Sequence, residues 1–62
     1  MKSYSSRDMI KIIEQDGWYL VRQNGSHRQY KHPNKVGLVT IPHPRKDLKT
    51  DTIRSILSQA GL

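Results

Sequence analysis

Apolar positions recur at helical spacing in the segment SSRDMIKIIEQDG, residues 5–17. The residues that form this stripe are Met9, Ile10, Ile12 and Ile13. Such spacing predicts an amphipathic helix with one buried face. Ser5 or Ser6 can cap its N-terminus, and Asp8 suits the positive end of the helix dipole. Gly17 can take the left-handed conformation that ends a helix.

Three short segments in the middle of the chain are typical of strands: WYLVRQ (18–23), HRQYKH (27–32) and VGLVTIP (36–42). They are rich in β-branched and aromatic residues or alternate in polarity. The dipeptide Asn24-Gly25 is favoured where both central residues of a hairpin turn need positive φ. Pro33 and Asn34 form a second turn signal. We therefore expect three consecutive antiparallel strands.

The C-terminal segment RKDLKTDTIRSILSQAGL, residues 45–62, predicts a second amphipathic helix. Its apolar residues at helical spacing are Ile53, Ile56, Leu57 and Ala60. Thr50, Asp51 or Thr52 can cap this helix or enter its first turn, and Gly61 lies where it should end.

The order helix, strand, strand, strand, helix predicts a single α+β domain over residues 1–62. Two amphipathic helices and one small sheet hide their apolar surfaces most simply when both helices cover one face of the sheet. The other face of the three-stranded antiparallel sheet is then left to solvent.

Alternation along the second strand divides its side chains between the two faces. We assign His27, Gln29 and Lys31 to the solvent face. The core face receives Arg28, Tyr30 and His32, with Arg28 fitting only at the sheet margin. Trp18 is also expected in the core, while the position of Tyr19 stays open.

Composition limits what such a chain can hold. It has 62 residues, of which 34% are hydrophobic, and no cysteine. A domain of this size buries only about 60% of the surface that its unfolded chain exposes, so we expect neither an enclosed cofactor nor a small-molecule cofactor of any kind. His27, His32 and His43 lack the spacing of metal ligands, and no metal site is predicted. No signal peptide or membrane span can be drawn, so we expect a cytoplasmic protein without membrane contact.

The net charge of +6 is concentrated between residues 18 and 49, since the segments before and after are each neutral. A segregated basic surface attracts polyanions, of which nucleic acid is the commonest. The cations that we expect to contact phosphate are Arg22, Arg28, Lys31, Arg45, Lys46 and Lys49. The last three precede or enter the first turn of the second helix, whose free N–H groups favour anions.

His27 is the one candidate general base that the sequence places at a plausible site. It follows the hairpin turn and lies in a basic field that favours a neutral ring. Taken by itself, however, a histidine in a small polar strand is more often an ordinary surface residue than a catalyst.

The motifs GSH (25–27), QYKHP (29–33), TIPHP (40–44) and a closing DLKTDTIRSILSQAGL together resemble the HicA toxin family of bacterial and archaeal HicAB toxin-antitoxin systems. The resemblance implies a fold like the double-stranded RNA-binding domain, ribosome-independent cleavage of mRNA, and neutralisation by a HicB antitoxin. It also implies that His27 is catalytic and that Gly25 and Ser26 form the turn before it. Many members read GSHH where this chain has Arg28 after His27.

We therefore predict the toxin of a type II toxin-antitoxin system: a metal-independent endoribonuclease that acts on single-stranded RNA, with His27 as general base. One alternative is a non-catalytic RNA-binding module with the same basic surface. Another is a protein-interaction module whose basic face docks an acidic partner.

Overall fold

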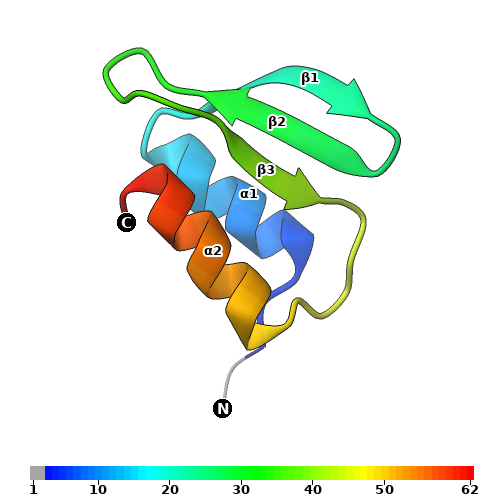
Figure 1. Ribbon diagram of the computed structural model, residues 1–62. Helices are drawn as coiled ribbons and strands as arrows, with labels where there is room; N and C mark the ends of the chain where they lie inside the picture. The colour runs from blue at the N-terminus through cyan, green and yellow to red at the C-terminus, as the bar shows by residue number, and fades with distance from the viewer. Residues whose placement is uncertain (1–2) are drawn as a thin grey trace.

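The computed structural model describes residues 3–62, in which two helices and three strands follow in the predicted order (Figure 1). The elements are α1 (Ser6–Gln15), β1 (Tyr19–Asn24), β2 (His27–Lys31), β3 (Val39–Pro42) and α2 (Thr50–Ala60). The sheet is antiparallel throughout, with strand order β1-β2-β3. Both helices lie on the same side of it (Figure 1). The predicted α+β fold class is confirmed.

Helix α1 begins with a capping box. The Ser5 hydroxyl accepts a hydrogen bond from the Asp8 N–H at 3.1 Å, and the Asp8 carboxylate accepts one from the Ser5 N–H at 3.0 Å. Two of the N–H groups left unpaired at a helix start are thereby satisfied. The helix ends before Gly17, whose φ is +111°. Ser5 is therefore the cap, and the predicted stop at Gly17 is confirmed.

The turn between β1 and β2 is centred on Gly25-Ser26, one residue later than the predicted Asn24-Gly25. Asn24 pairs with His27 as the last residue of β1. Gly25 has φ +60°, and no residue other than glycine has positive φ within residues 3–62. Glycine at the first central position of a two-residue turn is the type II′ pattern, which spares Asn24 a strained backbone. His27 consequently opens strand β2.

Strand β1 contains a bulge at Val21, between the pairs Leu20 with Tyr30 and Arg22 with Gln29. A bulge adds one residue to a strand and shifts the alternation of its side chains beyond that point. Residues directly opposite in an antiparallel pair project to the same face of the sheet. The bulge thus places Arg22 on the face of Gln29 instead of the face covered by the helices.

Strand β3 is shorter than predicted, since it begins at Val39 and not at Val36. Val36 is almost fully exposed, at 99% of its surface, and Gly37 has φ +97°, which is incompatible with a strand. The preceding Lys35 donates a 2.6 Å hydrogen bond to Asp16, next to the end of α1. Residues 32–38 consequently form a loop.

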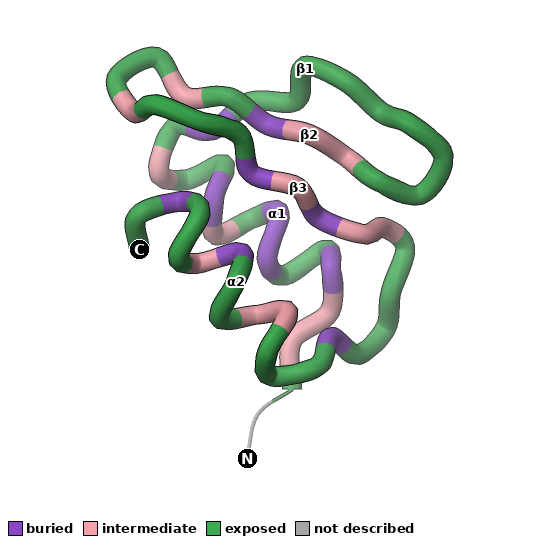
Figure 2. The backbone as a smooth tube through the Cα atoms, viewed as in Figure 1, coloured by how far each residue is buried: buried purple, intermediate pink, exposed green. Residues whose placement is uncertain are grey.

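The core lies between the helices and the sheet (Figure 2). Trp18 and Tyr30 are buried as predicted, whereas Tyr19 is half exposed. The buried hydrophobic residues are Met9, Ile10, Ile13, Trp18, Tyr30, Val39, Ile41, Leu48, Ile56 and Ala60. The buried side of β2 and β3 therefore faces the helices, and the other side of the sheet remains uncovered.

Lys35 fastens the C-terminal ends of both helices. Its Nζ donates to the Asp16 carboxylate at the end of α1 and, at 3.0 Å, to the Ala60 carbonyl at the end of α2. The hydrogen bond from Lys35 lowers the pKa of the Asp16 carboxyl, although partial burial opposes the shift. Lys35 therefore stabilises the packing of the two helix ends, even though it contributes to the positive charge in the middle of the sequence.

Helix α2 begins at Thr50, and its N-cap residue, Lys49, supplies no side-chain capping bond. Thr50, Asp51 and Thr52 lie in its first turn, so the alternative that one of them caps the helix is wrong. At the other end Gly61 has φ +72°, and the Leu62 N–H donates to the Leu57 carbonyl at 2.8 Å. The predicted stop at Gly61 is confirmed.

Candidate functional site

His27 lies on the uncovered face of the sheet, which we call the open face. The residues of this face, read from the strand pairing, are Tyr19, Arg22, Asn24, His27, Gln29, Lys31, Thr40 and Pro42. His27 is exposed, and none of the hydrogen bonds formed within residues 3–62 involves its ring. Both ring nitrogens can therefore meet a bound molecule.

The rings of the other two histidines form hydrogen bonds within the protein. The His32 ring accepts from the Asn34 N–H at 2.9 Å, so its Nε2–H is the donor to the Asp16 carbonyl at 2.6 Å. Its side chain is only 8% exposed. His43 has Nδ1 2.7 Å from the buried Ser6 hydroxyl. Of the three histidines, His27 alone has a ring without such a bond in the described part of the chain.

Two of the predicted cations share the open face with His27. Arg22 lies opposite Gln29, and Lys31 lies opposite Tyr19, at the far end of β2 from His27. Both cations are exposed. With a rise of about 3.3 Å per residue, Lys31 stands roughly 13 Å from His27 along the strand.

Arg28 projects to the other face, because it alternates with His27 and pairs with Ile41 of the core. It is partly buried, and neither its Nε nor the Tyr30 hydroxyl has a hydrogen-bond partner within residues 3–62. Burial raises the pKa of the Tyr30 phenol, and the nearby Arg28 charge opposes that shift. The structure therefore separates Arg28 from the cations around His27.

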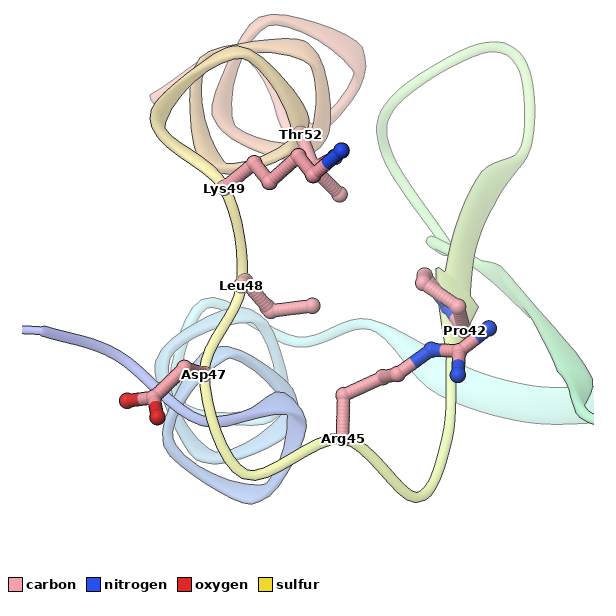
Figure 3. Close-up of a pocket in the computed structure, with 6 residues that line it drawn as sticks. All are labelled: Pro42, Arg45, Asp47, Leu48, Lys49 and Thr52. Atoms are coloured by element: carbon pink, nitrogen blue, oxygen red, sulfur yellow. The ribbon is translucent and has the colours of Figure 1, made fainter.

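A second group of predicted cations borders an open pocket of about 400 Å³ between the loop after β3 and the start of α2. Arg45 and Lys49 extend along this pocket from two sides, while Asp47 points away from it (Figure 3). The pocket is lined by Pro42, Arg45, Asp47, Leu48, Lys49 and Thr52. Lys46 is exposed in the same loop but does not line the pocket.

Pro42 connects the pocket with the open face. It lines the pocket and lies directly opposite His27 in the pairing of β2 with β3. The pocket therefore begins at the end of the sheet that carries His27. The sequence did not predict the other lining residues, Pro42, Asp47, Leu48 and Thr52, because no local pattern shows how the chain after β3 returns to the helix.

Among residues 3–62 no group of three histidine, cysteine, aspartate or glutamate side chains is placed to hold a metal ion. Neither helix of the described chain is long and apolar enough to cross a membrane.

Comparison with known proteins gives a consistent result. Residues 6–62 match the protein family described as "HicA toxin of bacterial toxin-antitoxin". A solved structure entitled "Toxin-Antitoxin complex from Streptococcus pneumoniae" contains a chain that is 32% identical, with a TM-score of 0.78. The similarity covers 94% of this chain and 97% of that one. No curated protein sequence matches.

Proposed function

This chain belongs to the HicA toxin family of bacterial toxin-antitoxin systems, and from that premise we propose that it is a metal-independent endoribonuclease. In this proposal it cleaves single-stranded mRNA without the ribosome, in the cytoplasm where its substrate lies. The observation that carries the proposal is the exposed His27 ring on the sheet face that also carries Arg22, with the pocket of Arg45 beginning at the residue opposite it, Pro42.

RNA supplies its own nucleophile, the 2′-hydroxyl. His27 takes the proton from that hydroxyl as its oxygen attacks the adjacent phosphorus. The bond to the 5′-oxygen breaks, and this oxygen leaves as a hydroxyl after taking a proton from water or from a neighbouring tyrosine or lysine. A histidine suits this role because its charge changes near physiological pH. Cleavage by this route yields a 2′,3′-cyclic phosphate.

Negative charge accumulates on the phosphate oxygens during the attack, and nearby cations stabilise it. Arg22 shares the open face with His27, and Arg45 lies in the pocket that starts at Pro42. These two are our candidates for the scissile phosphate. Lys31 is too distant along β2 and instead holds a neighbouring phosphate, as Lys49 does in the pocket.

The same surface suggests how the toxin is neutralised. The similar solved structure is a toxin-antitoxin complex, and we propose that a HicB-type antitoxin binds this chain. Covering the open face would block the access of RNA to His27. An antitoxin with acidic groups would also complement the cations there.

The substrate's chemistry tests the nuclease proposal. We expect the protein to cut labelled single-stranded RNA in EDTA and to leave 2′,3′-cyclic ends. A strand with a 2′-deoxynucleotide at the scissile position should resist, as should an all-DNA strand of the same sequence. Cleavage of the DNA strand would contradict attack by the 2′-hydroxyl.

A non-catalytic RNA-binding module is the second candidate. It is favoured by the absence, within residues 3–62, of any side chain hydrogen-bonded to His27 that would orient the ring as a catalytic base. Both candidates predict salt-dependent binding of RNA. Only the formation of product separates them.

A further inference from the structure

The hydroxyl of Ser6, the first residue of α1, connects the helix to the loop that carries Arg45. Ser6 is only 1% exposed. Its Oγ lies 2.7 Å from His43 Nδ1 and accepts a hydrogen bond from the Arg45 N–H at 2.9 Å. The Ser6 N–H donates to the Arg45 carbonyl at 2.9 Å. One buried residue therefore holds both backbone polar groups of Arg45.

A hydroxyl has one hydrogen to donate, and here two acceptors are within reach. His43 Nδ1 is 2.7 Å away, whereas the Arg45 carbonyl is 3.3 Å away and already accepts from the Ser6 N–H. The shorter bond is the better one. Ser6 Oγ therefore forms its shortest bond with His43 Nδ1, in a direction set by the tautomer of the ring, and accepts from the Arg45 N–H in either case.

His43 is also tied to the start of β2. Its N–H donates to the carbonyl of Ser26 at 2.6 Å, and Ser26 directly precedes His27. His43 thus joins the backbone beside His27, through Ser6, to the backbone of Arg45. The guanidinium of Arg45 in turn borders the pocket that begins at Pro42.

We propose that His43 and Ser6 are positioning residues that hold Arg45 at the pocket, where its guanidinium binds a phosphate of single-stranded RNA. The identity of this ligand rests on the proposed function. His43 and Ser6 act through Arg45 without touching the RNA. His43 therefore takes no direct part in proton transfer.

Hydrogen exchange of the free protein tests the positioning without any RNA. Ser6→Ala and His43→Ala should both speed exchange of the Arg45 amide, on the order of tenfold for the loss of one hydrogen bond. His43→Asn keeps a polar amide, which can donate or accept, near the position of Nδ1 and should restore much of the protection. Unchanged exchange in Ser6→Ala or His43→Ala would overturn the proposal.

Binding of a 2′-O-methyl oligonucleotide tests the consequence, since this probe carries phosphates but no free 2′-hydroxyl to be attacked. Arg45→Ala, Ser6→Ala and His43→Ala should each weaken binding by about three- to tenfold. Each should also reduce the slope of log K against log salt, by roughly 0.7 for one lost phosphate contact. In the Arg45→Ala background, the other two changes should have no further effect.

A merely structural role predicts different results. Ser5→Ala is the matched control, because it removes the helix cap next to Ser6 and, among residues 3–62, no hydrogen bond joins the Ser5 side chain to Arg45. Its binding should equal that of the wild type. Equal weakening by Ser6→Ala with and without Arg45 would overturn the proposal. If the binding pattern appears but RNA is never cut, the nuclease proposal fails and the positioning stands.

Discussion

Among single residues, Gly17 shows that the end of α1 leaves no space for a side chain. Its φ of +111° disfavours any side chain, and an added Cβ would lie 2.8 Å from Nε2 of His32. The His32 ring cannot move aside, because the Asp16 carbonyl and the Asn34 amide hold it. The position therefore requires glycine for two independent reasons.

We predict that Gly17→Ala destabilises the protein more than Gly37→Ala does. Gly37 has a similar φ of +97°, but nothing lies within 4 Å of a Cβ added there. Backbone strain alone costs about 1–3 kcal/mol at either site, and the contact with His32 adds to it only at Gly17. Urea denaturation of the two variants measures the difference. Equal losses would show that the His32 ring yields freely.

Residue identities could be predicted from sequence where a local rule applies. Ser5, Gly17 and Gly61 act as helix signals, and the alternation around Tyr30 correctly assigned the buried face of β2. The partners of Ser6 and His43 could not be predicted. They are 37 residues apart in sequence and meet only because the loop after β3 returns to α1.

At the scale of elements, the start of α2 combines weak capping with positive charge. Lys49 occupies the cap position without a capping bond, although serine there would supply one. The same lysine lines the pocket that we assign to phosphate. We therefore infer that lysine at position 49 favours phosphate binding at the expense of helix stability.

We predict that Lys49→Ser raises the free energy of unfolding by about 1 kcal/mol and weakens RNA binding. Lys46→Ser makes the same change of charge in the same loop but not at the cap, so its stability should stay near that of the wild type. Chemical denaturation and RNA titration of both variants check this. A Lys49→Ser protein that is no more stable than Lys46→Ser would contradict the capping argument.

The hydrogen bond between Lys35 and Asp16, where the two helices end, makes the stability of the protein depend on pH. The pKa of Asp16 is lowered in the folded protein by the hydrogen bond from Lys35, so the unfolded chain binds a proton more readily than the folded one. The stabilisation is therefore present above the unfolded pKa of about 4 and is lost as the pH falls through the folded pKa.

We predict that Asp16→Asn loses less thermal stability than the wild type between pH 5 and pH 2, since the variant has no such carboxylate to protonate. Asp47→Asn serves as control, because Asp47 is exposed and points away from the pocket (Figure 3). Melting temperatures across this pH range provide the measurement. Parallel curves for Asp16→Asn and the wild type would rule out the Lys35 contact as the cause.

Element types and their order could be predicted because periodicity and turn residues are local signals. The start of β3 and the exact hairpin turn could not. Val36 looks like a strand residue, yet Gly37 after it has φ +97° and Lys35 before it is bonded to the ends of both helices, so the strand begins only at Val39. The bulge at Val21, which sends Arg22 to the open face, has no sequence signal of its own.

At the scale of the whole molecule, charge and shape separate into two sides. The helices are charge-balanced in sequence and cover one face of the sheet, while the open face and the adjoining pocket gather Arg22, Lys31, Arg45 and Lys49. The segregation could be predicted from the sequence. That the pocket joins the open face at His27 depends on the pairing of Pro42 with His27, which the sequence does not display.

In the proposed mechanism, His27 removes the proton of the 2′-hydroxyl. The most direct measurement is single-turnover cleavage of labelled single-stranded RNA in EDTA by the wild type and by His27→Ala. Gln29→Ala, two residues along the same face, serves as the matched control. Circular dichroism spectra should first show that all three proteins are folded alike.

We predict that His27→Ala binds RNA nearly as well as the wild type but cuts it about 10² to 10⁴ times more slowly, the usual loss for a general base. Gln29→Ala should cut at close to the wild-type rate. A folded His27→Ala protein that cuts as fast as the wild type would contradict the claim.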